Sequence, residues 1–145
     1  MSANERQVGG EHYQSQYQHW DFVQRALDGR YLEGAITKYV SRWRKKNGLQ
    51  DLRKAEHYLQ KLIEEYQAGR IAGNNPYRIC ALQMEARSFS AANHLEAYEA
   101  VIMELMALWQ NLQSLNSANA ALHELMAEAL MDESGALRPK DFKEA

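Results

Sequence analysis

Apolar residues recur at steps of three and four along most of this chain, and this spacing constrains the fold more than any other feature. One such stripe consists of Leu32, Ile36, Tyr39, Val40 and Trp43, and another of Leu52, Ala55, Leu59, Leu62, Ile63 and Tyr66. A period near 3.6 residues is typical of an amphipathic α-helix. The 145 residues include only two prolines and eight glycines, so few helix breakers interrupt the pattern. We therefore predict an all-α fold the size of about one domain.

The first 68 residues are expected to form a short helix followed by a helical hairpin. The short helix runs from about Trp20 to Leu27 and stops at Asp28-Gly29. The second helix is ended by Asn47-Gly48, and Asp51 caps or opens the third. One face of the second helix is basic and carries Lys38, Arg42 and Lys45.

The short connection predicts that the second and third helices pack antiparallel. We expect this hairpin to bring Lys38 and Arg42 near Tyr58 and Lys61, with Asp51 and Lys54 closer to the turn.

Residues 69–145 are expected to form long helices after a Gly/Asn/Pro linker at 69–76. Pro76 suits the first position of a helix over about 77–87, with a break at 88–90. The longest stripe is that of a bundle helix or coiled-coil seam and contains Leu95, Tyr98, Ile102, Leu105, Trp109 and Leu112. It falters at 116–119, so residues 90–131 are either one interrupted helix or two helices, the second capped by Ser117.

Charge divides the chain into the same two parts. Residues 1–70 carry twelve Lys/Arg against nine Asp/Glu, whereas residues 71–145 carry five against ten. We interpret 1–68 as a basic helical module and 69–145 as an acidic helical extension that builds a homo-oligomer, within one compact unit. We find no tandem repeat. The split favours an anionic ligand in the first half or attraction between subunits, and the net charge of −2 argues against strong nucleic-acid binding.

Several classes of protein are excluded by what the sequence lacks. No apolar run approaches 18 residues and no signal-peptide core follows Met1, so we expect a cytoplasmic protein without a membrane partner. There is no P-loop and no Gly-x-Ser-x-Gly motif, and Cys80 is the single cysteine. The five histidines lack metal-ligand spacing, so we predict no metal site. A weak pattern suggests helical nucleotide pyrophosphohydrolases that bind magnesium through paired carboxylates, and comprises Glu96, Glu99, Glu104, Glu124 and Glu128.

The first half also carries a series of motifs in a fixed order. They are Val8-Gly9-Gly10-Glu11-His12-Tyr13, Gln18-His19-Trp20-Asp21-Phe22, Leu32-Glu33-Gly34, Lys38-Tyr39-Val40, Lys45-Lys46-Asn47-Gly48, Asp51-Leu52-Arg53-Lys54-Ala55 and His57-Tyr58-Leu59-Gln60-Lys61-Leu62-Ile63. Over about residues 8–66 this series resembles the SaV-like phage proteins, described as a domain of unknown function or as nucleotide kinase-like. They share a domain with a podophage nucleotide kinase that lacks a P-loop. Three positions depart from the family pattern, which usually has Pro, Asn and an aliphatic residue at His19, Ala35 and Thr37.

The resemblance implies a nucleotide site, and the residue types suit one. The candidate catalytic residues are His12, His57 and Asp51. The candidate ligand-binding residues are Gly10, Tyr13, Trp20, Glu33, Lys38, Arg42, Lys54 and Tyr58. Glycine amides and cationic side chains bind phosphate, aromatic rings stack on a base, and histidine transfers protons near neutral pH.

Three functions follow as expectations. The first is a phage-type nucleotide-binding protein, extending to a P-loop-free nucleoside monophosphate kinase, in which the basic helix neutralises phosphoryl charge. The second is a non-catalytic sponge that sequesters a nucleotide signal, cyclic or linear, for counter-defence against the host. The third is an oligomeric adaptor or nucleic-acid accessory protein. No cofactor is assigned beyond the nucleotide itself, and a role for Mg²⁺ stays open. Ala35, which replaces the usual Asn, weighs against catalysis more than against binding.

Overall fold

The predicted all-α fold is confirmed in a computed structural model of the chain, which describes residues 2–6 and 15–133. The α-helices of this part are α1 (His19–Ala26), α2 (Tyr31–Arg42), α3 (Leu49–Gln67), α4 (Ile79–Ala92), α5 (Ala97–Leu108) and α6 (Leu112–Glu133). A short 3-10 helix, η2 (Pro76–Arg78), precedes α4. The described residues include no β-strand.

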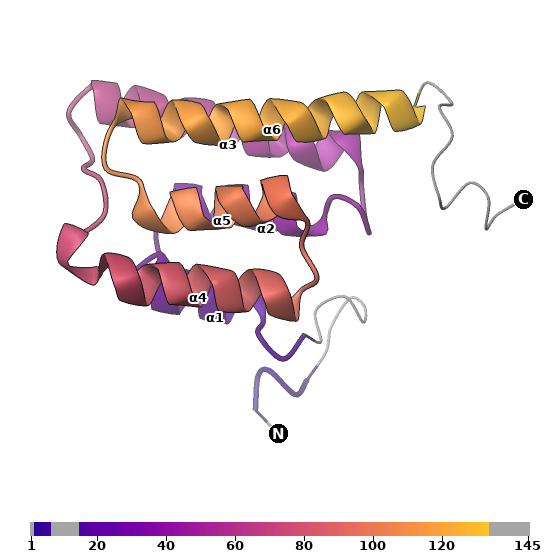
Figure 1. The fold of residues 1–145 in the computed structure, drawn as a ribbon, viewed down its shortest axis with the longest axis horizontal. Helices are drawn as coiled ribbons and strands as arrows, with labels where there is room; N and C mark the ends of the chain where they lie inside the picture. The colour runs from indigo at the N-terminus through magenta and orange to yellow at the C-terminus, as the bar shows by residue number, and fades with distance from the viewer. Residues whose placement is uncertain (1, 7–14, 134–145) are drawn as a thin grey trace, which may run out of the picture.

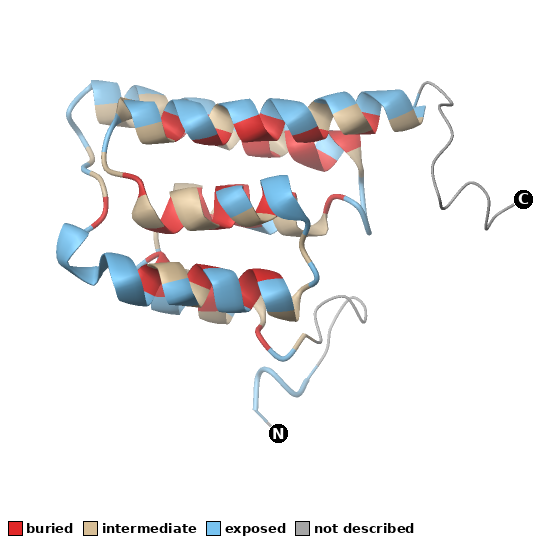
Figure 2. Ribbon diagram, viewed as in Figure 1, coloured by how far each residue is buried: buried red, intermediate tan, exposed pale blue. Residues whose placement is uncertain are grey.

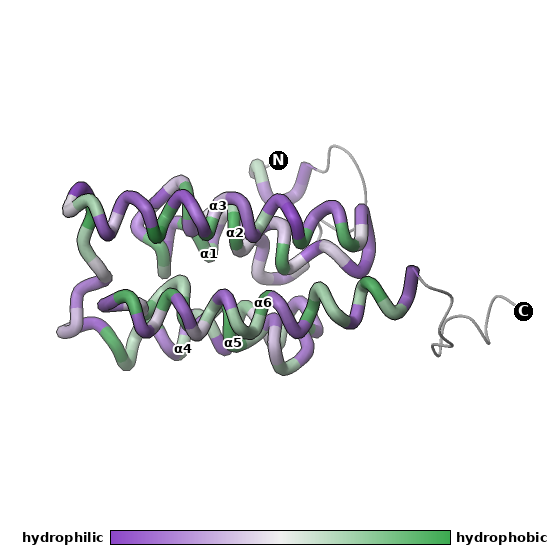
Figure 3. Tube along the Cα trace, turned by 90° about the horizontal axis from the view of Figure 1, so that it is seen from above, coloured by the Kyte–Doolittle hydropathy of each residue, from purple (hydrophilic) through white to green (hydrophobic). Residues whose placement is uncertain are grey.

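The helices are arranged in three layers of two (Figure 1). One layer holds α1 and α4, the middle layer α2 and α5, and the third α3 and α6. Seen from above, α1, α2 and α3 lie on one side of the molecule and α4, α5 and α6 on the other (Figure 3). Each layer therefore combines one helix from each half of the chain.

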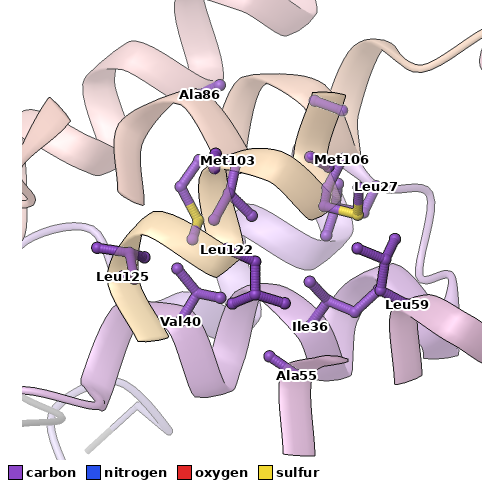
Figure 4. Close-up of a cluster of buried hydrophobic side chains, with 14 of the residues drawn as sticks. Leu27, Ile36, Val40, Ala55, Leu59, Ala86, Met103, Met106, Leu122 and Leu125 are labelled. Atoms are coloured by element: carbon purple, nitrogen blue, oxygen red, sulfur yellow. The ribbon is translucent and has the colours of Figure 1, made fainter. Parts of the chain in front are cut away.

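One hydrophobic core joins the two halves. The buried faces of the helices point towards the middle of the molecule (Figure 2), because each helix carries its apolar residues on one stripe. A close-up of the core shows side chains from α2 and α3 beside those of α5 and α6, including Ile36, Val40, Leu59, Met103, Met106, Leu122 and Leu125 (Figure 4). All seven are at most 1% exposed. The first half therefore packs against the second rather than standing apart from it.

The ends of α2 and α3 differ from the prediction. Helix α2 stops at Arg42, and residues 43–48 form successive turns in which the amide of Gly48 donates to the carbonyl of Trp43 (2.9 Å). Gly48 has φ +56° and precedes Leu49, the first residue of α3. Asp51 thus lies in the first turn of α3 and does not open the helix, and Lys45 lies beyond the face of α2. Trp43, the first residue after α2, is buried in the core.

Helices α2 and α3 pack together as the predicted antiparallel hairpin, but one expected neighbour was wrong. Arg42 lies at the turn end, where it pairs with Asp51, rather than beside Tyr58 and Lys61. Lys61 instead pairs with Glu65 on its own helix. In an antiparallel hairpin the last residues of the first helix face the first residues of the second, and the prediction had reversed this order for Arg42.

Two predicted breaks in the second half were misplaced. Helix α4 continues through 88–90 to Ala92, and Ser90 is buried. The stripe from Leu95 to Leu112 is not one helix, because α5 ends at Leu108 and α6 begins at Leu112. Residues 116–119 lie inside α6, where the hydroxyl of Ser117 donates to the carbonyl of Gln113 instead of capping a helix.

The break between α5 and α6 is made by Trp109. Its backbone is extended (ψ 141°), and its carbonyl accepts the amide of Asn74 (2.8 Å). The indole is completely buried. The side-chain oxygen of Asn111 then accepts the amide of Ser114 (3.0 Å) near the start of α6. Helix α5 therefore ends at a buried tryptophan, although the apolar spacing in the sequence continues to Leu112.

Although no repeat is evident in the sequence, the structure contains two three-helix units with the same plan. Helices α2 and α5 are each 12 residues long, and each is followed at once by a buried tryptophan, Trp43 or Trp109. Three residues before each helix stands a residue with positive φ, Asp28 (52°) or His94 (55°). We call residues 19–67 the first unit and residues 79–133 the second unit.

Candidate functional site

A pocket of about 310 Å³ opens on the first unit, between α1, α2 and the middle of α3. Its walls are formed by His19, Val23, Gly29, Arg30, Tyr31, Gly34, Ala35, Lys38, Tyr39 and Tyr58. The small residues Gly34 and Ala35 leave space on the pocket face of α2. A volume near 300 Å³ lies at the lower end of the range of small-molecule sites.

Three tyrosine rings form one wall of this pocket. Tyr39 and Tyr58 stack with their centroids 5.9 Å apart and their planes 22° apart. Tyr31 meets Tyr58 edge-on, and the two hydroxyl oxygens are 3.4 Å apart. Tyr31 is 72% exposed, so its ring has room to move against a ligand. The wall offers flat aromatic surface together with hydroxyl groups that donate and accept hydrogen bonds.

Cationic side chains surround the Tyr39 ring of this wall. Lys38 Nζ, the Arg42 guanidinium carbon and Lys54 Nζ lie 5.8, 4.9 and 5.4 Å from the Tyr39 centroid. Arg42 also pairs with the buried carboxylate of Asp51 (3.4 Å). Among the described residues, neither Lys38 nor Lys54 forms an ion pair. The surface around Tyr39 is therefore positively charged and suited to an anion.

His19, from α1, also lines the pocket and is neutral. Its Nε2 lies 2.8 Å from the hydroxyl oxygen of Thr37, which also lies within hydrogen-bonding distance of the backbone carbonyl of Glu33 (2.9 Å). Burial, together with the positive charges of Lys38 and Arg42, lowers the pKa of His19 to about 4. The charge of the pocket thus comes from Lys38 and Arg30, not from the imidazole.

Beneath the pocket, Glu33 holds Arg30 in place. The Glu33 carboxylate is buried and accepts Arg30 Nη1 at 3.0 Å and the indole N–H of Trp109 at 3.1 Å. The Arg30 guanidinium lies 6.0 Å from the centre of the Trp109 ring. Glu33 does not line the pocket. Its contribution to a ligand site passes through Arg30, a residue that the sequence analysis did not select.

The structure brings together only some of the candidate residues. Lys38 and Tyr58 line the pocket, and Arg42 and Lys54 flank the ring of Tyr39. Trp20 lies outside the lining and donates its indole N–H to Asn4 (2.6 Å).

Two other candidates lie outside the pocket lining, and three cannot be placed. His57 is exposed on α3 and does not line the pocket, and the carboxylate of Asp51 is occupied by Arg42 and the amide of Asn47. The candidates Gly10, His12 and Tyr13 lie outside the described residues.

The remaining lining residues were missed for a structural reason. Arg30 and Tyr31 lie at the start of α2, before its apolar stripe, and His19 comes from α1, which reaches the same pocket only because α1 packs against α2. Tyr39 belongs to the apolar stripe of the second helix and was assigned to the core, yet its ring is half-buried. The only sequence feature that connects Tyr39 with the pocket is its closeness along the chain to Lys38 and Arg42.

Four acidic residues of the second unit form ion pairs with arginines. Arg44 pairs with Glu96 (3.0 Å), Glu99 (3.2 Å) and Glu128 (2.6 Å), and Arg87 pairs with Glu104 (2.6 Å). Within residues 2–6 and 15–133, no group of three or more His, Cys, Asp or Glu side chains is placed to hold a metal ion. None of the helices in the same part of the chain is both long and apolar enough to cross a membrane.

Comparison with known proteins places a family match over the pocket. Residues 8–60 match the sequence model of a family described as a protein of unknown function (DUF3310). The matched segment includes every residue that lines the pocket. No curated protein and no solved structure matches the chain. The similarity is thus to a family without an assigned activity, over most of the range where the resemblance was expected.

Proposed function

We propose that this protein binds a nucleotide in the pocket of the first unit. The observation that carries the proposal is the composition of one small cavity, whose walls combine three tyrosine rings with Lys38 and Arg30. A nucleotide needs a flat surface for its base and cations for its phosphates. Both are present within a volume of about 310 Å³.

The tyrosine wall supports binding of the base. Stacking of a base on an aromatic side chain is worth roughly 1–3 kcal/mol and tolerates any base. Tyr31, which is exposed, is free to close over a base lying against Tyr58. The hydroxyl groups of both tyrosines are available to the base or the sugar.

The cations support binding of phosphate. Lys38 has no carboxylate partner among the described residues, so its charge is available to an anion. Arg30 uses one N–H group on Glu33 and reaches the carbonyl of Gly73 at 3.5 Å, which leaves other donors of the guanidinium for phosphate oxygens. Lys54, at the side of Tyr39, adds to the positive field.

We propose binding without turnover as the primary activity. The kinase-like activity implied by the resemblance needs a group that accepts a proton next to the phosphate. Of the candidate catalytic residues that are described, Asp51 is paired with Arg42 and His57 faces solvent outside the pocket. A protein that holds a nucleotide and keeps it from other partners needs only the wall residues described above.

The test is a calorimetric titration of nucleoside mono- and triphosphates and cyclic nucleotides into the wild type, Lys38→Ala and Lys45→Ala. We expect saturable binding of at least one nucleotide by the wild type, and a loss of about tenfold or more in Lys38→Ala, equivalent to about 1.4 kcal/mol. The matched control Lys45→Ala removes an exposed lysine outside the pocket and should bind normally.

Two results of this test would count against the proposal or change it. Absence of binding by every nucleotide, or equal binding by Lys38→Ala, would refute the proposed site. Chromatography of the mixtures separates the remaining possibilities, because recovery of an unchanged nucleotide supports simple binding and appearance of a new phosphate ester supports the kinase-like alternative.

A further inference from the structure

The two units can be aligned residue by residue. In α2 and α5 the identical pairs are Glu33 and Glu99, Ile36 and Ile102, and the closing Trp43 and Trp109. In α3 and α6 they are Leu49 and Leu112, Gln50 and Gln113, Leu52 and Leu115, Ala55 and Ala118, Leu59 and Leu122, Leu62 and Leu125, and Glu65 and Glu128. The shared residues are mostly core residues, and the three-layer arrangement places each helix beside its counterpart (Figures 1 and 3).

A reciprocal pair of hydrogen bonds connects the units. The indole of Trp43 in the first unit donates to Glu99 in the second (3.0 Å), and the indole of Trp109 in the second unit donates to Glu33 in the first (3.1 Å). Both glutamates are the third residue of their helix, and both are at most 3% exposed. Helices α2 and α5 therefore run antiparallel, as two-fold symmetry between the units requires.

Each buried glutamate also binds an arginine that packs on the same tryptophan. Arg30 pairs with Glu33, and its guanidinium lies 6.0 Å from the centre of the Trp109 ring. Arg44 pairs with Glu99 and lies 4.3 Å from the Trp43 ring. The surroundings of the two arginines differ, because Arg44 is also bound by Glu96 and Glu128, whereas Arg30 faces the pocket.

The second unit lacks the residues that build the pocket. At the positions of Arg30, Tyr31, Lys38, Tyr39 and Tyr58, the second unit has Glu96, Ala97, Glu104, Leu105 and Ala121. Every aromatic ring of the wall is lost, and two cations are replaced by carboxylates. A nucleotide has no equivalent place to bind there.

From this comparison we propose that the second unit serves the ligand site of the first through Trp109, which acts as a positioning residue for Arg30. The chain of contacts runs from the Trp109 indole to the Glu33 carboxylate and from there to the guanidinium in the pocket wall. The ligand group served is an anionic phosphate. This inference rests on the proposed nucleotide site and adds that each chain binds one nucleotide, in the first unit only.

The symmetry of the units supplies a matched control for this proposal. Trp109→Phe removes the N–H group that Glu33 accepts, and Trp43→Phe removes the N–H group that Glu99 accepts, while both keep a large buried ring. A carboxylate that loses a buried donor is destabilised by a similar amount in both variants. Only Trp109→Phe disturbs a residue of the pocket.

The experiment measures nucleotide affinity and stoichiometry by calorimetry in the full-length chain and in both variants, with thermal unfolding alongside. We expect one nucleotide per wild-type chain, a loss of about fivefold or more in affinity for Trp109→Phe, and a change of less than about twofold for Trp43→Phe. Equal affinities in Trp109→Phe and wild type, or equal losses in the two variants, would overturn the positioning role. Two nucleotides per chain would overturn the loss of the second pocket.

Failure of this inference is distinguishable from failure of the proposed function. If the wild type binds no nucleotide, the proposed site and this inference are both refuted. If the wild type binds and Trp109→Phe binds equally well, the nucleotide site stands and only the inference falls. Should Trp109→Phe not fold, Glu33→Gln compared with Glu99→Gln gives the same contrast between the two units.

Discussion

Replacing His19 with glutamine should remove a specific part of the pH dependence of folding stability. His19 is held neutral in the pocket wall, where its ring bonds to Thr37 and faces the charges of Lys38 and Arg42. Glutamine keeps a polar group of similar length that can bond to the Thr37 hydroxyl but does not titrate. The comparison therefore isolates the protonation of one side chain.

The size of the effect follows from the shift in pKa. The pKa of His19 falls from 6.5 to about 4 on folding, so the unfolded chain binds a proton more readily than the folded chain in this interval. The stability that neutral His19 allows is fully present above pH 6.5 and is lost as the pH falls towards 4. The total loss is about 3 kcal/mol at about 1.36 kcal/mol per pKa unit, and at pH 5 it has reached about 2 kcal/mol.

The assay is urea denaturation of the wild type and His19→Gln at pH 8 and pH 5. The wild type should lose about 2 kcal/mol more than the variant between these two values, because all other titrating groups are common to both proteins. Nuclear magnetic resonance titration of the His19 ring gives the pKa directly. The same pH dependence in both proteins, or a His19 pKa near 6.5 in the folded chain, would refute the reasoning.

Three further predictions concern the fold, each measured by chemical denaturation. Leu122→Ala should lower the free energy of unfolding by about 2–5 kcal/mol, since the side chain is 1% exposed between the two units, and a loss below about 1 kcal/mol would contradict its place in the core. Glu99→Ala should cost about 2–4 kcal/mol by leaving Arg44 and a buried indole without their shared acceptor, whereas Glu99→Gln should cost less. Gly73→Ala should destabilise the chain by more than about 1 kcal/mol, because the added methyl would lie 2.5 Å from the Cα of Gln110; unchanged stability would show that this backbone contact is looser than described.

The sequence was sufficient for the fold class and for the hairpin of α2 and α3, because apolar periodicity reports which face of each helix is buried. It was not sufficient for the helix ends. The stripe from Leu95 to Leu112 continues without a fault through Trp109, yet the helix stops there because the indole is held by Glu33 in the other unit. Spacing along a chain carries no information about such a long-range bond.

The repeat escaped notice for a related reason. The positions shared by the two units are mostly buried apolar residues, which recur in any helical protein, together with a tryptophan, a glutamine and two glutamates in each unit. At some corresponding surface positions the two units carry opposite charges, as at Lys38 and Glu104. Only when Trp43 and Trp109 are seen to make reciprocal bonds does the correspondence become clear.

Part of the candidate site was accessible from sequence and part was not. Lys38 and Tyr58 followed from the basic face and the resemblance, and both line the pocket. His19 enters the wall only through the packing of α1 against α2, and Arg30 precedes the apolar stripe of α2, so periodicity selects neither residue. Asp51, proposed both as a helix cap and as a catalytic group, is buried with Arg42 in the first turn of α3.

The most direct test of the central claim is to follow backbone amide resonances of the full-length chain while a panel of nucleotides is added. The proposed site predicts that a binding nucleotide shifts the amides around the pocket, at Arg30, Tyr31, Lys38, Tyr39 and Tyr58. The amides of the corresponding positions in the second unit should remain unchanged, at Glu96, Ala97, Glu104, Leu105 and Ala121. Shifts centred on the second unit, or no saturable shifts with any nucleotide, would contradict the account.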